Sequence, residues 1–241
     1  MKLFLTLCTL SLLTLTGCFS VNFGGLANVQ GTGEIVSQDI DVANFTGINV
    51  GSAFNIIYRQ AETPHITVSM QENLLSYLRA ETVNGILEVS FNRTVSTTAG
   101  NTPRLYVYGP YLSSVTLSGA ASAQDWDTIN ADSFNLVASG AVSGSIDLNV
   151  EDFTLTGSGA VAISLSGNAT TANLILSGAC NINAADLQTI DAVVSLSGAG
   201  SADIAVSGTL DARVSGVGVI TYIGNPQVTS SVTGVGSVRG R

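Results

Sequence analysis

The chain has 241 residues, of which 45% are hydrophobic and only 10% are charged, and its formal net charge is −9. The hydrophobic content is too high for an intrinsically disordered chain, and the length allows one large all-β domain or two small ones. With 17 acidic residues and Lys2 as the single lysine, the chain cannot neutralise a phosphate backbone, which excludes nucleic-acid binding.

The first residues follow the order of a bacterial lipoprotein signal. Lys2 gives a positive start, an apolar run from Leu3 to Leu15 follows, and Leu15-Thr16-Gly17-Cys18 resembles the bacterial lipobox. Residues 1–17 are therefore predicted to be a signal peptide, with Cys18 lipidated after cleavage. The apolar run is too short to span a membrane, whereas two or more acyl chains anchor a protein stably. An ordinary signal peptide that ends near a cysteine is the alternative.

The residues after Cys18 bear on localisation. Phe19 stands where lipoproteins retained in the inner membrane of some Gram-negative bacteria have Asp, so the resemblance implies the outer membrane, with the periplasmic or surface face left open. Residues 18–33 are rich in Gly and Asn and are expected to form a lipidated tether. With Cys8 removed and Cys18 acylated, Cys180 is alone and no intramolecular disulfide is expected.

Residues 34–241 are predicted to form a single β-helix domain, in which residues 34–110 are irregular first coils that cap the regular part. One segment in this half, Gln71–Arg79, is predicted to form one or two helical turns. Alternating apolar residues predict its strands. These strands are expected at Glu34–Val42, Phe45–Arg59, His65–Met70, Ile86–Asn92 and Arg104–Tyr108.

Residues 111–241 contain a sequence repeat of about 19 residues, which decides the predicted fold. Each copy has an apolar residue two places before a glycine and, except at Ser230 in the last copy, another one four places before it, which is the pattern of a strand with one buried face. A hydroxyl residue stands directly before the glycine. The glycines that the sequence aligns are Gly119, Gly140, Gly157, Gly178, Gly198, Gly216 and Gly234. The hydroxyl residues are Ser118, Ser139, Thr156, Ser177, Ser197, Ser215 and Thr233.

A single repeat of this length cannot close a core, but stacked coils can. We therefore expect an all-β fold, a right-handed parallel β-helix, with a glycine at one bend of each coil where φ is positive or no Cβ atom fits. A second strand of each coil is visible in Ser145–Leu148, Ile163–Leu165 and Ala202–Val206. A β-sandwich of many short strands is the alternative, but it would not impose one register on seven glycines.

Three segments resemble the autotransporter adhesin head, or GIN-domain, family of bacterial envelope proteins. They are Phe45-Thr-Gly-Ile-Asn-Val50, Asn84-Gly-Ile-Leu-Glu-Val89, and Tyr111-Leu112 leading into Leu117-Ser-Gly-Ala120. The resemblance covers roughly residues 35–238. It implies a right-handed β-helix, often on a lipoprotein, and its motifs specify the fold better than the function.

The best candidates for chemistry are carboxylates beside the single tryptophan, Trp126. Asp125, Asp127 and Asp132 surround it, and paired carboxylates next to an aromatic ring suit sugar binding or glycosidic hydrolysis. Carbohydrate-active β-helix enzymes use Lys, Arg or His near such acids, however, and the mature chain has no lysine. We therefore expect a polar loop here, with Trp126, Asp125 and Asp127 as candidate ligand contacts and no catalytic residue.

Other candidates have simpler structural interpretations. His65 is the only histidine, so no His-based metal site is expected, and the repeat lacks the calcium-binding pattern of some solenoids. Cys180 stands in a column of small residues and is interpreted as a packing residue. Tyr106, Tyr108 and Tyr111 are interpreted as a cap between the irregular and regular coils, with a stacking patch as the alternative.

These observations predict a lipid-anchored cell-envelope protein whose β-helix is a non-catalytic, adhesin-like or structural interaction module. No cofactor is expected. The expected partners are the membrane, through the N-terminal lipid, and envelope proteins or glycans. The alternatives are a carbohydrate-active enzyme that uses the aspartates near Trp126 and an envelope-stress accessory protein.

Overall fold

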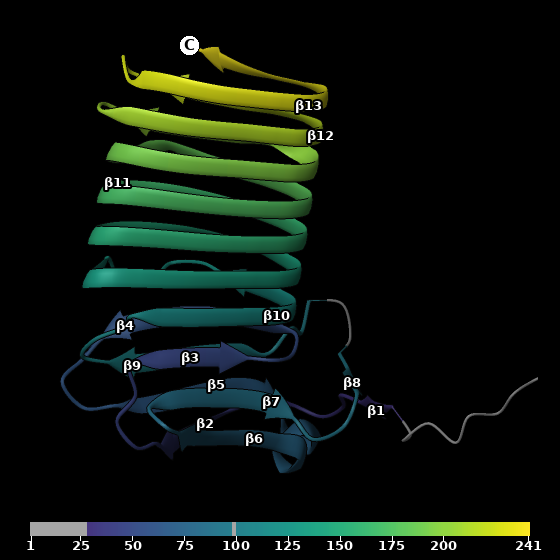
Figure 1. Cartoon of the computed structure of the whole chain (residues 1–241). Coiled ribbons are helices and arrows are strands. Elements are labelled where there is room, and N and C mark those ends of the chain that lie inside the picture. The colour runs from purple at the N-terminus through teal and green to yellow at the C-terminus, as the bar shows by residue number, and fades with distance from the viewer. Residues whose placement is uncertain (1–27, 98–99) are drawn as a thin grey trace, which may run out of the picture.

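The computed structural model describes residues 28–97 and 100–241, and this part of the chain is almost entirely β-structure (Figure 1). The all-β class predicted from the sequence is confirmed. The helical element within these residues is the short 3-10 helix η1 (Glu72–Tyr77). The strands are β1 (Val29–Gln30), β2 (Ile35–Asp41), β3 (Gly47–Val50), β4 (Phe54–Gln60), β5 (His65–Gln71), β6 (Leu78–Val83), β7 (Ile86–Phe91), β8 (Val95–Ser96), β9 (Arg104–Gly109), β10 (Ser114–Ala123), β11 (Ile129–Val206), β12 (Thr209–Ile223) and β13 (Gln227–Gly240).

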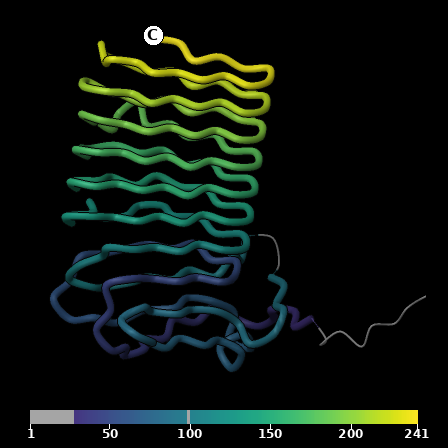
Figure 2. Tube along the Cα trace, viewed as in Figure 1, coloured from purple at the N-terminus to yellow at the C-terminus, as the bar shows by residue number. Residues whose placement is uncertain are grey.

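The repeat forms coils that lie one above another (Figures 1 and 2). Strand β11 is 78 residues long because the chain winds through several coils while it stays paired. Successive coils pair in parallel, with Gly119 beside Gly140 in β10 and β11 and Gly198 beside Gly216 in β11 and β12. Each residue therefore lies next to its counterpart one repeat later.

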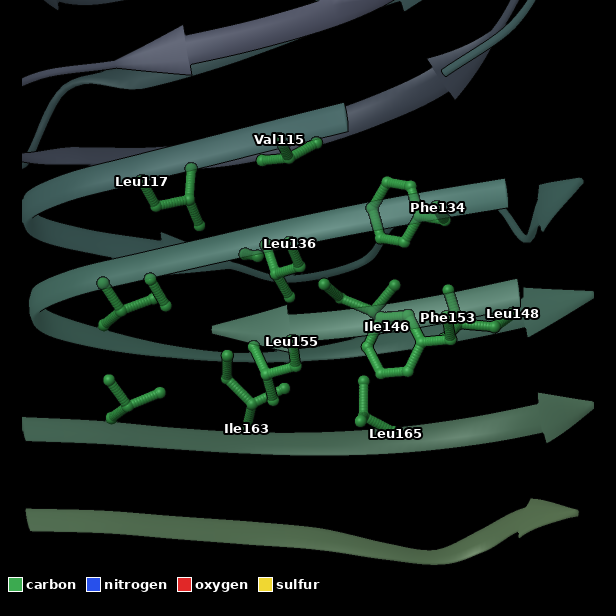
Figure 3. Close-up of a cluster of buried hydrophobic side chains, with 14 of the residues drawn as sticks. Val115, Leu117, Phe134, Leu136, Ile146, Leu148, Phe153, Leu155, Ile163 and Leu165 are labelled. Atoms are coloured by element: carbon green, nitrogen blue, oxygen red, sulfur yellow. The ribbon is translucent and has the colours of Figure 1, made fainter. Parts of the chain in front are cut away.

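The interior of the coils is filled by the apolar residues that alternate along each strand (Figure 3). Leu136, Phe153 and Leu155 are all at most 1% exposed. The rings of Phe134 and Phe153, from neighbouring coils, stack with centroids 6.1 Å apart. Full burial of one such side chain contributes about 1.5–3 kcal/mol, so each coil is stabilised by its neighbours.

Seven glycines lie one above another at one bend of the coils. Six of them are those aligned from the sequence, but in the third coil the aligned residue is Gly159, and the prediction of Gly157 is wrong. A Cβ atom on Gly159 would lie 2.5 Å from the carbonyl oxygen of Gly140, and one on Gly178 would lie 2.6 Å from that of Gly159. Gly159 also has a φ of +96°. Both the close approach and the positive φ require glycine.

This error has a physical cause. Gly157 and Gly159 are two residues apart, and because side chains alternate with a period of two, both alignments bury the same face of the strand. Gly157 instead faces other interior side chains, since a Cβ there would lie 3.2 Å from a methyl carbon of Leu176. The hydroxyl residue before the aligned glycine is accordingly Ser158 and not Thr156.

The hydroxyl residues next to these glycines bind the backbone of the neighbouring coil. Ser118 Oγ donates to the Val50 carbonyl at 3.3 Å, and Ser177 Oγ donates to the Gly157 carbonyl at 3.3 Å. The column therefore satisfies backbone carbonyls at the bend, as its composition indicates.

The end of the molecule below β10 lacks the repeat. Strands β3 and β4 form a coil that pairs in parallel with the two halves of β10, and β7 and β9 pair in parallel with β3 and β4 on their other side. Beyond them the pairing becomes antiparallel, between β6 and β7, between β5 and β9, and between β2 and β5. Figure 1 shows these strands at the lower end of the stack.

Most of the strands expected in this region are present, with two differences. The segment Phe45–Arg59 is not one strand, because the chain bends at residues 51–53 between β3 and β4. The helical turns expected at Gln71–Arg79 end earlier, at Tyr77, and β6 follows. Strand β6 forms a hairpin with β7 through Asn84-Gly85, both of which have positive φ, as a two-residue turn requires.

Candidate functional site

Trp126 lies in the core and not on an open surface. It is 9% exposed, and its indole N–H donates to the Ile56 carbonyl at 2.7 Å. Its ring is tilted against that of Tyr58, with centroids 6.1 Å apart, and the Tyr58 hydroxyl donates to the Gly109 carbonyl at 3.0 Å. These contacts of Trp126 with Ile56 and Tyr58 therefore hold the segment between β10 and β11 against β4.

Asp125 and Asp127, on either side of the tryptophan, both bind Arg59 of β4. Arg59 Nη2 lies 2.5 Å from Asp125 Oδ2, and Nη1 lies 3.5 Å from Asp127 Oδ1. The second oxygen of Asp127 accepts a hydrogen bond of 2.9 Å from the Gln60 backbone N–H. The sequence analysis did not predict this contact, because Arg59 is 66 residues away from Asp125 in the chain and only the pairing of the coils brings the two together.

The arrangement gives these carboxylates a structural role. Both groups lie against the same guanidinium, which links the segment around Trp126 to β4. Asp132 is an exposed residue of β11, and within the described residues it forms no hydrogen bond or ion pair with this cluster. Ligand contact at Trp126, Asp125 and Asp127 stays a prediction.

Burial raises the pKa of Tyr58 to about 12, and the charge of Asp127 contributes in the same direction. The phenol therefore remains protonated at neutral pH and acts as a hydrogen-bond donor, as its contact with Gly109 requires.

His65 lies in β5, and Tyr106 and Tyr108 lie in the neighbouring strand β9. The rings of His65 and Tyr108 stack with centroids 4.2 Å apart and planes 4° apart, and Tyr106 pairs with Thr67 on the same side of β9. Since the imidazole face is covered by Tyr108, the contact stabilises the pairing of β5 and β9. In residues 28–97 and 100–241, no group of three or more His, Cys, Asp or Glu residues could hold a metal ion.

Cys180 is completely buried, and its thiol donates to the Ser177 carbonyl at 3.3 Å. Burial raises the pKa of the thiol, which disfavours the reactive thiolate. The residue at the same position in the preceding coil is Val161, because the aligned glycine of that coil is Gly159 and both residues stand two places after their glycine. A packing role is therefore the one that its surroundings support.

Cys18, the predicted lipidation site, lies outside the described residues. The described ranges contain no helix long and apolar enough to cross a bilayer.

A groove on the regular coils was not predicted from the sequence. It has a volume of about 610 Å³, and its floor consists of the buried residues Ala172, Ala192 and Leu210. Its walls are the polar positions on either side of this floor. They include Thr171, Asn173, Asp191, Thr209, Asp211, Gln227 and Thr229. From the sequence alone these residues would be interpreted as an ordinary solvent-exposed face. The groove itself depends on the path of the coils, which the sequence pattern does not specify.

Comparisons with known proteins agree with this architecture. A model of the family described as "Putative auto-transporter adhesin, head GIN domain" matches residues 44–226. No curated protein matches the chain.

Several solved structures share the fold. A protein of Bacteroides fragilis described as a "putative adhesin" is 22% identical with a TM-score of 0.83, and the match covers 89% of this chain and 100% of that chain. A "putative adhesin" of Parabacteroides merdae is 23% identical with a TM-score of 0.64, covering 89% and 99%. A "Putative lipid binding protein" of Parabacteroides distasonis is 22% identical with a TM-score of 0.60, covering 89% and 100%. At these identities the likeness shows the fold alone.

Proposed function

The chain belongs to the family of the auto-transporter adhesin head GIN domain, as its sequence motifs indicate, and on this premise we propose that it is a lipid-anchored, non-catalytic binding module of the bacterial cell envelope. The observation that carries the proposal is the register of the coils, in which the residues of β10, β12 and β13 pair in parallel with their counterparts one repeat away. Such a stack is a rigid scaffold that displays outward side chains at fixed intervals.

We further infer that the stack is a right-handed parallel β-helix formed by residues 34–241. The parallel pairing of β10 with β11, and of β12 with its neighbours, supports this inference. So does the single column of glycines at one bend. A sandwich of two independent sheets would not need a glycine at the same bend of each repeat.

A binding role is favoured over catalysis by what surrounds the acidic residues. The two aspartates beside Trp126 are paired with Arg59, and the buried Cys180 is held as a thiol. The names of the similar solved structures, two of them "putative adhesin" and one "Putative lipid binding protein", also refer to binding and not to catalysis. Carried over to this chain, they support an adhesin-like role.

Membrane attachment in this proposal depends on Cys18. After removal of residues 1–17, an acylated Cys18 and the tether of residues 18–33 would hold the domain at a membrane surface, which we assign to the outer membrane because Phe19 and not Asp follows the cysteine. Two or more acyl chains supply stable anchoring without a spanning helix.

The anchor is tested by expressing the full-length protein in a Gram-negative host with radioactive palmitate. We expect the label on the wild-type protein and on the control Cys8→Ser, and not on Cys18→Ser, which should leave the membrane fraction. An unlabelled wild type, or a labelled Cys18→Ser variant, would contradict the lipid anchor.

The binding role is tested separately with the lipid-free 19–241 chain. A glycan array and a pull-down from envelope extract should yield a reproducible partner. If both experiments give none, the module is not a binding protein.

A further inference from the structure

The groove over β11, β12 and β13 has the chemistry of a ligand site, and nothing in the fold requires it to be polar. Its residues come from four successive coils, as Thr171, Asp191, Thr209 and Gln227 show. Since neighbouring strands are about 4.8 Å apart, these four rungs extend for roughly 14 Å along the axis of the stack. The volume of about 610 Å³ is within the range of small-ligand sites.

One carboxylate in the groove is fixed in position. Asp191 Oδ1 accepts hydrogen bonds from the Thr209 hydroxyl at 2.6 Å and from the Thr209 backbone N–H at 2.9 Å. These bonds lower the pKa of Asp191, so the carboxylate is charged at neutral pH. Within the described residues its other oxygen, Oδ2, makes no hydrogen bond and is available to a ligand.

Two amides in the groove have unused hydrogen-bonding groups. In the part of the chain that the structure describes, the side chains of Asn173 and Gln227 have no hydrogen-bond partner. Each offers two N–H donors and one carbonyl acceptor. Val193, which is 38% exposed, adds an apolar surface beside them.

The charge of the groove restricts the ligand. Asp191 and Asp211 are acidic, the residues that line the groove include no Lys or Arg, and Asp211 forms an ion pair with Arg213, which is not one of them. An anionic ligand would be repelled by the uncompensated Asp191.

The strand pairing argues against an extended peptide as the ligand. A peptide that adds to a sheet needs an unpaired strand edge. The end strand of the described sheet is β13, which carries Gln227 and Thr229, whereas the groove lies mainly on β11 and β12. Strand β12 is paired on both sides along the groove, with Leu210 between Ala192 and Val228. Recognition there must use side chains, and a mixture of carboxylate, amides and hydroxyls beside a small apolar surface suits ligands that carry several hydroxyl groups.

We propose that this groove binds a neutral or amino-sugar oligosaccharide that lies along the axis of the stack. Asp191 and the amides of Asn173 and Gln227 bind its hydroxyl or ammonium groups, and Val193 contacts its apolar ring face. The proposal rests on the binding role proposed above and names the ligand class for it.

The test uses the full-length protein in detergent and isothermal titration calorimetry with three probes. They are cello-oligosaccharides as neutral ligands, chitosan oligomers as amino sugars, and oligogalacturonates as anionic ligands. We expect binding of a neutral or amino-sugar probe and none of the anionic probe. Asn173→Ala and Gln227→Ala should each weaken binding about 2- to 10-fold, the effect of one lost hydrogen bond.

Asn135→Ala is the matched control, because Asn135 occupies the same outward column as Asn173 two coils away and outside the groove. It should leave the affinity unchanged. The proposal is overturned if neither the neutral nor the amino-sugar probe binds, if the anionic probe binds more tightly, or if both groove variants bind like the wild type. In each of these cases the proposed binding role still stands or falls on the pull-down, and the lipid anchor on the palmitate labelling.

Discussion

The regular coils and the lower end of the molecule obtain their strand register in different ways. In the coils, the neighbour of each residue is found one repeat away, as with Gly198 and Gly216. At the lower end, β4 pairs with β9 and with β10, as Asn55 with Arg104 and Phe54 with Ala121 show, and it lies between these two strands in the sheet. A repeat thus specifies neighbours locally, whereas the lower end needs contacts between distant segments.

The two regions nevertheless share one interior. A single cluster of buried side chains runs from Phe45 and Met70 at the lower end to Val214 and Ile220 in β12. This continuity predicts that the described domain unfolds as one unit, although stacked repeats can also lose cooperativity.

The largest expected effect comes from the core of the regular coils. Phe153→Ala removes a ring that stacks on Phe134 and should destabilise the domain by about 3–5 kcal/mol. Leu105→Ala, in β9 of the lower end, should cost about 2–5 kcal/mol. Urea unfolding followed by circular dichroism measures both. If either variant unfolds in two separate transitions, the two regions are not one cooperative unit.

The second prediction concerns Tyr58, which joins the two regions. The pKa of Tyr58 is about 12 in the folded chain and near 10 in the unfolded chain. Between these two pH values the folded state therefore keeps the phenol protonated, whereas the unfolded chain loses the proton. The resulting stability is complete below pH 10 and is lost as the pH rises towards 12. Tyr58→Phe should lose about 1 kcal/mol at pH 7, from the hydrogen bond to Gly109, and should be less sensitive to alkali. Equal alkaline sensitivity of both proteins would contradict this.

The third prediction concerns Arg59, which holds the aspartates beside Trp126. The side chain of Asp125 is 82% exposed, so this ion pair is screened by water. Arg59→Ala should therefore cost at most about 1 kcal/mol, with a smaller effect at high salt. Thermal unfolding at two salt concentrations checks the size of the effect. Arg59 also donates to the backbone carbonyls of Tyr58 and Asp125. A loss of several kcal/mol would contradict the small contribution expected of a solvent-screened ion pair.

The smallest effect is expected at Asp191 in the groove. The pKa of Asp191 is lower in the folded chain than in the unfolded chain, where it is about 3.9, so its carboxylate stabilises the folded state at pH values above about 3.9. This stabilisation is lost as the pH falls below about 3.9 and through the lower pKa of the folded state. Thr209→Val removes the hydroxyl that binds Asp191, so its stability should change less with pH below pH 4 than that of the wild type. A matching slope in the two acid-unfolding curves would remove this role for Thr209.

The sequence predicts the regular coils well because their information is local. Alternation identifies the buried residues, and the bend requires glycine, so six of the seven glycines were aligned correctly. The exception, Gly157 in place of Gly159, shows the limit of such patterns, since a shift by two residues preserves the buried face.

The strand order of the lower end, the contacts around Trp126 and the groove are harder to predict from the sequence. The hairpin at Asn84-Gly85 has a local signal, but no pattern places β4 between β9 and β10. The sequence also placed Trp126 among carboxylates without showing that Arg59 binds them. The groove was invisible for a similar reason, because Asn173 and Gln227 are separated by three coils in the chain.

The register of the third coil tests the stacked-coil account most directly. A Cβ atom on Gly159 would lie 2.5 Å from the Gly140 carbonyl oxygen at a φ of +96°, whereas one on Gly157 would lie 3.2 Å or more from its neighbours, all of which are side-chain atoms. Comparing the free energies of unfolding of Gly159→Ala and Gly157→Ala, we predict a loss of about 3 kcal/mol for the first and less than about 1.5 kcal/mol for the second. Equal losses, or a greater loss at Gly157, would contradict the register and with it the rigid scaffold.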